Sequence, residues 1–345
     1  MAGAAAGLTV DRPLLAFIGH LETAEAYLDL LTCARGDDLP KLSLEEIEPL
    51  LRVLDPMPVC SLTLRSIRGT AVLAHYIDVG LLPDVQTGLR KALARIRLAG
   101  LEARAAGARL GVLGGFTSIL GELAGVDLGR DLGLPFTTGN TLAAAVIAEQ
   151  VASLEPHLDG SSVTVVGAGG DVGSGLSRIL HARGVRLLLV GRTRRPLENL
   201  ATELKGAQPL SWPEAASRSK IVVLAASAAA GSIPLDAVPS QAFVLDAGHP
   251  PNARLDGHAH YAVAGRVTHA LPPECDLPAL LSARYATGES HACLAEGEVL
   301  AFEERWERFS SGRGRIVPER AEEILGLAQR HGIRPAPMRF GGPSD

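Results

Sequence analysis

Residues 161–183 read Ser-Ser-Val-Thr-Val-Val-Gly-Ala-Gly-Gly-Asp-Val-Gly-Ser-Gly-Leu-Ser-Arg-Ile-Leu-His-Ala-Arg, and this stretch decides the fold. The β-branched run at 163–166 predicts a buried strand, and an amphipathic helix follows the glycines and stops at Gly184. Strand, glycine loop and helix, in that order, are how proteins hold a dinucleotide pyrophosphate. The helix N-terminus presents unpaired N–H groups, and the glycines let the backbone approach the phosphates.

The glycine spacing is a variant of the usual dinucleotide pattern. Gly167, Gly170 and Gly173 give G-x-x-G-x-x-G, whereas Gly167, Gly169 and Gly173 miss the strict G-x-G-x-x-G by one residue. A second apolar strand follows directly at 185–190. A tight turn that binds nothing is the alternative. The predicted cofactor contacts are Gly167, Gly169, Gly170, Asp171, Val172, Gly173, Arg192, Thr193 and Ala226.

The end of the second strand favours NADPH over NADH. Sites for NAD usually place Asp or Glu there to bind the ribose 2′-hydroxyl, whereas an Arg accommodates the 2′-phosphate of NADP. Residues 191–195 read Gly-Arg-Thr-Arg-Arg and contain no acid. Arg192 is placed to pair with the phosphate and Thr193 to donate a hydrogen bond to it. A solvated basic turn is the alternative.

Length and composition predict a two-domain α/β enzyme. The chain has 345 residues, enough for two cores, and 47% hydrophobic content with 4% aromatics fits an Ala/Leu/Val-rich enzyme. Further buried strands are expected at 220–225, 242–246 and 261–264, which completes a doubly wound, Rossmann-type parallel sheet. The expected division is a disordered tail (1–12), an N-terminal α/β substrate or catalytic domain (13–140), an NADPH-binding domain (141–285) and C-terminal helices (286–345).

Several function classes are disfavoured. The net charge of −5 gives no general attraction to nucleic acid. We find no apolar run of about 18 residues and no signal-peptide pattern. The four cysteines (Cys33, Cys60, Cys275, Cys293) lie far apart, which indicates neither a disulfide framework nor a metal site. We therefore expect a cytoplasmic protein in which a single thiol can act as a nucleophile.

Outside the cofactor region, the pattern predicts a strand at 14–18, helices at 22–31 and 44–54, and a hairpin of 62–67 with 70–77. A basic helix is expected at 85–110, then a glycine turn at 113–118. A long helix is expected to begin near 140, with Thr138 or Asn140 as its N-cap. The last helices are expected at 290–309, on an apolar stripe, and at 318–330, with Pro318 in the first turn.

Cys293 is the candidate nucleophile. With Ser290 as N-cap, Cys293 is the third residue of its helix, where exposed N–H groups and the helix dipole favour a thiolate. The neighbouring His291 would lower the thiol pKa further if its ring faced the sulfur. The alternative is a small buried filler beside the apolar stripe.

The chain resembles the long-chain acyl-(acyl-carrier-protein) reductases of cyanobacteria, which form fatty aldehydes. The blocks that carry the resemblance are Phe17-Ile-Gly-His-Leu21, His75-Tyr-Ile77, Arg90-Lys91, Leu113-Gly-Gly-Phe-Thr-Ser-Ile119, Phe136-Thr-Thr-Gly-Asn-Thr141, Val166-Gly-Ala-Gly-Gly-Asp-Val-Gly-Ser174, Ala292-Cys293 with Ala295-Glu296, and Arg330-His-Gly332. Three blocks depart from the family: His291 and Leu294 replace its aromatic flank, Ala247-Gly248-His249-Pro250 replaces its Gly-Tyr-Pro, and Leu271-Pro-Pro-Glu-Cys-Asp276 replaces its Cys-Phe-Asp.

The resemblance implies that Cys293 accepts the acyl group and that NADPH reduces it to an aldehyde. The expected substrate carrier is acyl carrier protein or CoA, and an aldehyde-consuming enzyme is a possible downstream partner. His291 is the predicted catalytic histidine, while His20, His249 and His269 are further candidates for the proton donor. Candidate oxyanion or substrate contacts are Gly115, Phe116, Thr117, Ser118, Thr138 and Asn140.

Basic residues on the helix at 85–110 suit an acidic carrier protein, whose charge would steer the encounter. The predicted docking residues are Arg90, Arg95 and Arg97, and a solvated helix face is the alternative.

Three other functions stay open. One is an oxidoreductase like shikimate dehydrogenase or glutamyl-tRNA reductase. The second is Cys-dependent acyl transfer or thioester hydrolysis without net reduction. The third is a non-catalytic dinucleotide-binding protein, which a buried, unreactive Cys293 would favour.

Overall fold

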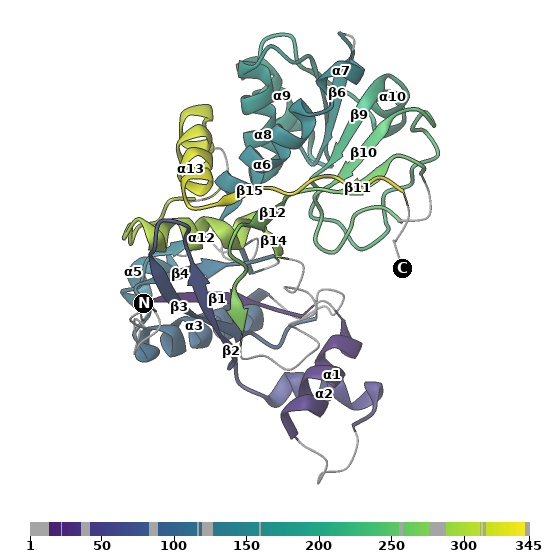
Figure 1. The fold of residues 1–345 in the computed structure, drawn as a ribbon. Helices are drawn as coiled ribbons and strands as arrows, with labels where there is room; N and C mark the ends of the chain where they lie inside the picture. The colour runs from purple at the N-terminus through teal and green to yellow at the C-terminus, as the bar shows by residue number, and fades with distance from the viewer. Residues whose placement is uncertain are drawn as a thin grey trace.

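A computed structural model describes residues 14–21, 23–35, 42–82, 89–115, 117–118, 127–158, 160–254, 258–275, 288–310, 312 and 315–341. The predicted tail 1–12, Phe116 and the stretch 276–285 lie outside these residues. Within them the chain forms two six-stranded sheets and a three-stranded sheet, with helices between and around them (Figure 1). None of the described helices is both long and apolar enough to cross a membrane.

The first sheet is mixed and comes mainly from the N-terminal part of the chain. Its strand order is β13-β2-β3-β1-β4-β5, with β3, β1, β4 and β5 parallel and β2 and β13 antiparallel to their neighbours. The strands are β1 (Leu15–Gly19), β2 (Met57–Arg65), β3 (Ala71–Asp78), β4 (Leu110–Leu113), β5 (Phe136–Thr137) and β13 (Glu274–Cys275).

Helices cover both faces of this sheet. One face packs on α3 (Leu89–Ala106), with α5 (Leu128–Leu132) against that helix, and the other packs on α12 (Ala292–Phe302). The apolar cluster under α3 includes Ala16 and Ile96. A small separate cluster joins α1 (Ala24–Arg35) to α2 (Leu44–Val53), which project from the end of the molecule remote from the second sheet (Figure 1).

The second sheet is wholly parallel, with the order β11-β10-β9-β6-β7-β8. The strand order runs from β6 outward to β7 and β8 on one side, and to β9, β10 and β11 on the other, which is the doubly wound arrangement. A dinucleotide usually binds where the strand order reverses, which here is between β6 and β9. The strands are β6 (Ser162–Val166), β7 (Leu187–Val190), β8 (Gln208–Pro209), β9 (Ser219–Leu224), β10 (Phe243–Asp246) and β11 (Tyr261–Val263), and the helices are α6 (Asn140–Ala152), α7 (Glu155–Leu158), α8 (Asp171–Ala182), α9 (Arg194–Glu203) and α10 (Trp212–Ser217).

The two large sheets share one apolar core. The three-stranded sheet of β12 (Arg266–His269), β14 (Glu289–His291) and β15 (Ile333–Pro335) lies between them, with α13 (Pro318–Arg330) beside α6 (Figure 1). A continuous cluster of buried side chains runs from Phe17 of the first sheet through α6 and α12 to Val165 of the second. The helix α12 is therefore fixed between the sheets.

The predicted α/β class with a Rossmann-type parallel sheet is confirmed, as are the hairpin and the helix at 318–330. Four predictions of detail are wrong. The helix predicted to reach Phe309 ends at Phe302, and the basic helix ends at Ala106, after which 110–113 forms a strand. The N-cap of α6 is Gly139, not Thr138 or Asn140. Ser290 lies in β14 and does not cap α12.

Candidate active site

The glycine loop has the geometry that a dinucleotide pyrophosphate requires. Gly167 has φ +83°, and a Cβ there would lie 2.5 Å from the Ala225 carbonyl oxygen. A Cβ on Gly173 would lie 2.3 Å from the Gly167 carbonyl oxygen, so the helix packs on the loop only with glycine at both places. Gly170 is the N-cap of α8. Because the first N–H groups of a helix have no partner within it, they remain for phosphate oxygens.

The other predicted cofactor residues lie around the same edge of the sheet. Arg192 and Thr193 are exposed directly after β7, and the Thr193 hydroxyl makes no capping bond to α9. The Ala226 N–H, in contrast, donates to Asn252 Oδ1 at 3.0 Å, so the structure uses it to hold the loop after β10.

Cys293 is the second residue of α12, one place earlier than predicted, with His291 at the N-cap. Its backbone lies against Gly139, where a Cβ would be 1.9 Å from the Cys293 carbonyl oxygen. The next residue, Asn140, donates from Nδ2 to Asp171 Oδ2 at 2.9 Å. Asp171 is the first residue of α8. Two contacts, joined by the peptide bond between Gly139 and Asn140, therefore connect the thiol-bearing residue to the helix that opens the dinucleotide site.

The thiol is not the low-pKa group that its helix position predicts. Cys293 is a free cysteine and is half-buried. Burial raises its pKa to about 11, and the Glu296 charge acts in the same direction, while backbone N–H groups of Gly115, Leu294 and Cys293 oppose them. Desolvation outweighs the helix N-terminus here. With this pKa only about one thiol in ten thousand is ionised at pH 7, so deprotonation needs a base.

Three histidines gather beside the thiol, and we call them with Cys293 and Gly115 the thiol centre. The rings of His249 and His291 meet edge to face with centroids 4.5 Å apart, and His20 and His249 are 6.5 Å apart. A Cβ on Gly115 would lie 3.2 Å from His20 Nε2 and 3.5 Å from His249 Cδ2. Sequence reasoning named these histidines but had no signal that they converge.

Each segment of the thiol centre follows the carboxyl end of a strand. His20 follows β1, Gly115 follows β4, and His249 follows β10 of the second sheet. The loop that carries His249 is held by the buried Asp246 carboxylate, which accepts from the N–H groups of Gly248 (2.8 Å) and Ala253 (2.9 Å). It also accepts from the Tyr261 hydroxyl at 2.8 Å. Both sheets thus direct the end of a strand at one place, where α/β enzymes usually bind ligands.

His269, also named as a proton donor, does not belong to this centre. Its Nδ1 donates to the Gly288 carbonyl (3.2 Å) and its Nε2 to Glu298 Oε2 (3.0 Å). Burial disfavours its charge, but Glu298 and the Gly288 carbonyl outweigh that effect and raise its pKa. Both ring nitrogens are therefore occupied by structural partners.

The predicted oxyanion residues divide into two groups. The Thr117 hydroxyl donates to the Gly114 carbonyl at 2.8 Å and the Ser118 hydroxyl to the Gly115 carbonyl at 2.8 Å. Their N–H groups bond to the same two carbonyls, so both residues stabilise the turn. Thr138 differs, since its buried hydroxyl has no hydrogen-bond partner among the described residues. Asn140 is engaged with Asp171.

A buried carboxylate that sequence reasoning did not single out fixes the start of α6. Glu296 is fully buried, and its Oε1 accepts from Thr137 Oγ1 at 2.5 Å. Its Oε2 accepts from the Leu142 N–H at 3.0 Å and from Ser310 Oγ at 2.8 Å. The Ser310 hydroxyl in turn accepts from the Thr141 N–H at 3.0 Å. Since Gly139 has no side chain, these residues of other segments cap α6 in its place.

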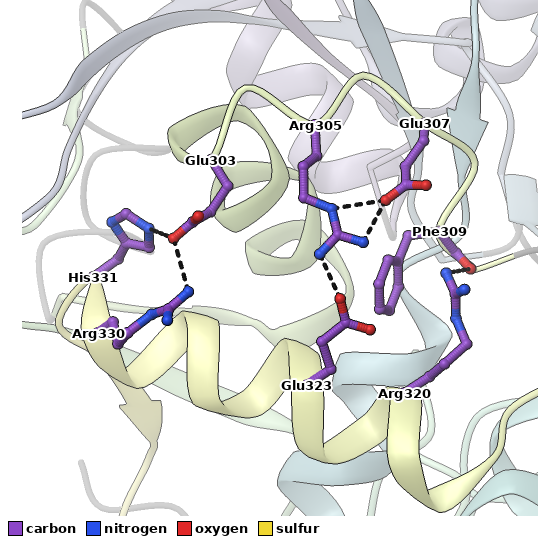
Figure 2. Close-up of polar contacts among 8 residues, drawn as sticks. All are labelled: Glu303, Arg305, Glu307, Phe309, Arg320, Glu323, Arg330 and His331. Atoms are coloured by element: carbon purple, nitrogen blue, oxygen red, sulfur yellow. Dashed lines mark hydrogen bonds and ion pairs between the residues drawn. The ribbon is translucent and has the colours of Figure 1, made fainter.

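The segment that supplies Ser310 is clamped onto α13 (Figure 2). Glu303 accepts from His331 at 2.8 Å and from Arg330 at 3.3 Å, and Arg305 bridges Glu307 and Glu323 (Figure 2). Further along, Arg320 donates to the Phe309 carbonyl at 3.1 Å. Glu304 has a φ of +54°, which ends the helix. The apolar stripe continues past this break because Phe309 packs against α13 as a loop residue.

The predicted docking arginines are not equivalent. Arg95 is half-buried and donates to the Val79 carbonyl at 2.5 Å and to the Leu54 carbonyl, and burial lowers its pKa. Arg97 pairs with Asp131 at 2.5 Å, whereas Arg90 is exposed at the start of α3. Arg95 therefore holds the loops after β3 and α2 in place.

Comparison with known proteins decides the family. The long-chain acyl-[acyl-carrier-protein] reductase of Synechococcus elongatus is 32% identical over 340 residues, which cover 93% of this chain and 98% of that protein. The chain belongs to the long-chain acyl-[acyl-carrier-protein] reductase family. As a member of this family it is an oxidoreductase that uses a nicotinamide dinucleotide.

Other known proteins are less similar to this chain. Aminotransferase PigE of a Serratia species is 29% identical over 264 residues, which cover 68% of this chain but 29% of that protein. Quinate dehydrogenase from Corynebacterium glutamicum, in complex with NAD, superposes over 91% of this chain and 98% of its own, with 15% identity and a TM-score of 0.39. That score is too low to support any argument about this chain. No family model matches.

Proposed function

We propose that the enzyme reduces a fatty acyl thioester to an aldehyde with NADPH, through an acyl group carried on Cys293. One observation carries the proposal. Cys293 packs on Gly139, and the adjacent Asn140 bonds to Asp171 at the start of α8. A thiol this close to the dinucleotide edge can present an acyl carbon to a reductant.

In the first half-reaction, the Cys293 sulfur attacks the thioester carbonyl carbon. A carbon–sulfur bond forms to Cys293, the bond to the carrier thiol breaks, and the thiol proton of Cys293 passes to the leaving sulfur. Thioester exchanges for thioester, so the step is nearly balanced in free energy. The acyl-enzyme then holds the carbonyl at a fixed place on α12.

Backbone N–H groups are the proposed oxyanion donors. The backbone N–H groups of Gly115, Leu294 and Cys293 already form hydrogen bonds with the Cys293 thiol. A carbonyl carbon bonded to the sulfur places its oxygen within reach of the same groups. This assigns the oxyanion to the start of α12 and to Gly115, where the partial positive charge of the helix end also acts.

The residues present fit NADPH. Gly167 and Gly173 give the close approach, α8 gives its N-terminus, and the exposed Arg192 and Thr193 fit the 2′-phosphate. When bound, the cofactor supplies the hydride that converts the acyl group to an aldehyde. In that step Cys293 leaves as a thiolate and takes up a proton, which returns the enzyme to its first state.

Acyl carrier protein is the proposed substrate carrier, as the name of the Synechococcus relative states for that protein. Docking is assigned to the exposed basic start of α3, Arg90 and Lys91, in place of Arg95. A carrier protein with an acidic surface would be steered to this end.

Product analysis tests the function. Purified enzyme is incubated with hexadecanoyl-acyl carrier protein and either NADPH, NADH or no cofactor, and products are separated by gas chromatography. We expect hexadecanal with NADPH, much less with NADH and none without cofactor. Free fatty acid without cofactor would indicate acyl transfer or hydrolysis, and no product in any arm would indicate a different substrate or a non-catalytic protein.

A further inference from the structure

We propose that His20 is the general base that takes the thiol proton of Cys293 and delivers it to the leaving carrier thiol. This assignment rests on the proposed function and selects His20 from the histidines that the sequence offers as proton donors.

A hydrogen bond fixes the tautomer of His20. Its Nδ1 lies 3.0 Å from the Leu21 carbonyl oxygen. A carbonyl only accepts, so Nδ1 carries the hydrogen and the neutral ring bears its lone pair on Nε2. Leu21 is itself held, because its N–H donates to the Tyr27 hydroxyl, which donates to Asp78 at 2.8 Å. The ring is thus oriented as the base of a nucleophile–base pair is, by a partner on its other nitrogen.

The basic nitrogen faces the thiol centre. His20 Nε2 would be 3.2 Å from a Cβ on Gly115, and the Gly115 N–H bonds to the Cys293 thiol. Gly115 has φ +57°, a conformation suited to glycine, and a side chain there would meet the His20 ring. His20 is itself buried, with 7% of its surface exposed, so bulk water does not compete strongly for the proton.

The thiol needs such a base because burial keeps it protonated at neutral pH. In the proposed step, the proton moves from Cys293 Sγ to His20 Nε2 as the sulfur–carbon bond forms. The resulting imidazolium gives that proton to the carrier sulfur as the old carbon–sulfur bond breaks. After hydride transfer, the Cys293 thiolate takes its proton from solvent, by way of the same ring.

The surroundings of His20 favour this route. The His20 ring has its centroid 6.5 Å from that of His249, which lies in the loop after β10. Through Leu21 it is connected to the pair Tyr27 and Asp78. Of the other imidazoles, His249 and His291 lie edge to face with their ring centroids 4.5 Å apart. His269 is occupied at both nitrogens.

The test uses His20→Asn. The Asn amide nitrogen reproduces the place of Nδ1 and retains the bond to Leu21, while the basic nitrogen is lost. The rate of acyl-enzyme formation with hexadecanoyl-CoA, without NADPH, is measured by intact mass between pH 7 and pH 10.5. His181→Asn, on the last turn of α8, is the matched control, and His249→Asn and His291→Asn are measured beside it.

At pH 7 we expect acyl-enzyme formation to be slower in His20→Asn than in wild type by about 100-fold or more. The ratio of the wild-type rate to the variant rate should fall toward one as the pH rises, because hydroxide then deprotonates the thiol. A merely structural role would give a ratio independent of pH. Imidazole added to His20→Ala should restore the rate. The assignment is overturned if the ratio does not vary with pH, or if His249→Asn or His291→Asn alone shows this pattern. Absence of adduct in wild type would instead refute the proposed function.

Discussion

Cys293 and Gly139 touch backbone to backbone, where the chain leaves the first sheet to enter α6. A Cβ at Gly139, whose φ is +71°, would lie 1.9 Å from the Cys293 carbonyl oxygen and 2.4 Å from its Cα. Gly139→Ala must therefore displace either α12 or the start of α6. We expect acyl-enzyme formation to fall about 100-fold, because a displacement of about 1 Å costs that much at a reacting centre.

The control for Gly139→Ala is Gly184→Ala. Gly184 also has a positive φ (+80°), but nothing lies within 4 Å of a Cβ there. Both variants carry backbone strain of about 1 kcal/mol, so only the contact with Cys293 differs. Equal rates of acylation in the two variants would mean that the contact is unimportant for the site.

Glu296→Gln is expected to lower the pKa of the Cys293 thiol. The Glu296 charge is one of the causes that raise this pKa to about 11, and the Gln side chain removes it. We expect the midpoint of iodoacetamide alkylation against pH to move below that of wild type. The variant should also lose about 1–3 kcal/mol of stability, since Gln cannot accept all three bonds.

Glu298→Gln is the comparison for this experiment. Glu298 is a buried acid on the same helix, but it pairs with His269. Its loss should leave the alkylation midpoint where it is in wild type. If both variants moved the midpoint equally, a general loosening of α12 would explain the change and the specific effect of Glu296 would be disproved.

Asp78→Asn is expected to stabilise the protein at neutral pH. The buried Oδ1 accepts from Tyr27 and Gly80, bonds that Asn retains, while Oδ2 has no partner among the described residues. Burial raises the Asp78 pKa from 3.8 to about 6, so the folded state binds the proton more tightly than the unfolded chain. Ionised Asp78 therefore costs stability, and the cost grows as the pH rises from about 4 to about 6.

Urea unfolding at pH 4.5 and pH 7.5 measures this effect. The stability of Asp78→Asn minus that of wild type should increase between the two pH values by about 2 kcal/mol. A difference that stays constant, or that shifts in favour of wild type at the higher pH, would contradict the raised pKa.

The docking proposal predicts a defect specific to the protein carrier. The double variant Arg90→Glu with Lys91→Glu reverses the exposed charge at the start of α3. We expect the KM for acyl-acyl carrier protein to rise about tenfold and that for acyl-CoA to change little, because steering acts on the extended charge of a protein. Lys205→Glu, at an exposed position after α9, controls for net charge. Equal increases in KM for both substrates would contradict the proposed docking surface.

Local signals predicted much of this molecule. The glycine loop and its helix followed from residues 163–184, and Pro318 marked the start of α13 correctly. The stripe that predicted a helix to Phe309 failed because apolar spacing does not reveal that Glu303 binds His331 and Arg330 at a helix end. The apolar spacing continues beyond the end of the helix because Phe309 packs against the core from a loop.

The thiol centre depends on contacts that no local pattern encodes. His20, Gly115 and His249 come from three strand ends far apart in sequence, and Glu296 acts on α6 from another helix. The low thiol pKa expected from the helix position was wrong for the same reason. Desolvation by distant segments determines the pKa, and the sequence does not show which segments those are.

The central claim is that the sulfur of Cys293 carries the acyl group at the edge of the dinucleotide site. Intact-mass analysis of the enzyme after incubation with hexadecanoyl-acyl carrier protein, without NADPH, measures it directly. The account predicts one added hexadecanoyl group in wild type, none in Cys293→Ala, and its loss as hexadecanal when NADPH is added. An adduct that persists in Cys293→Ala, or an acyl-enzyme that NADPH does not discharge, would contradict it.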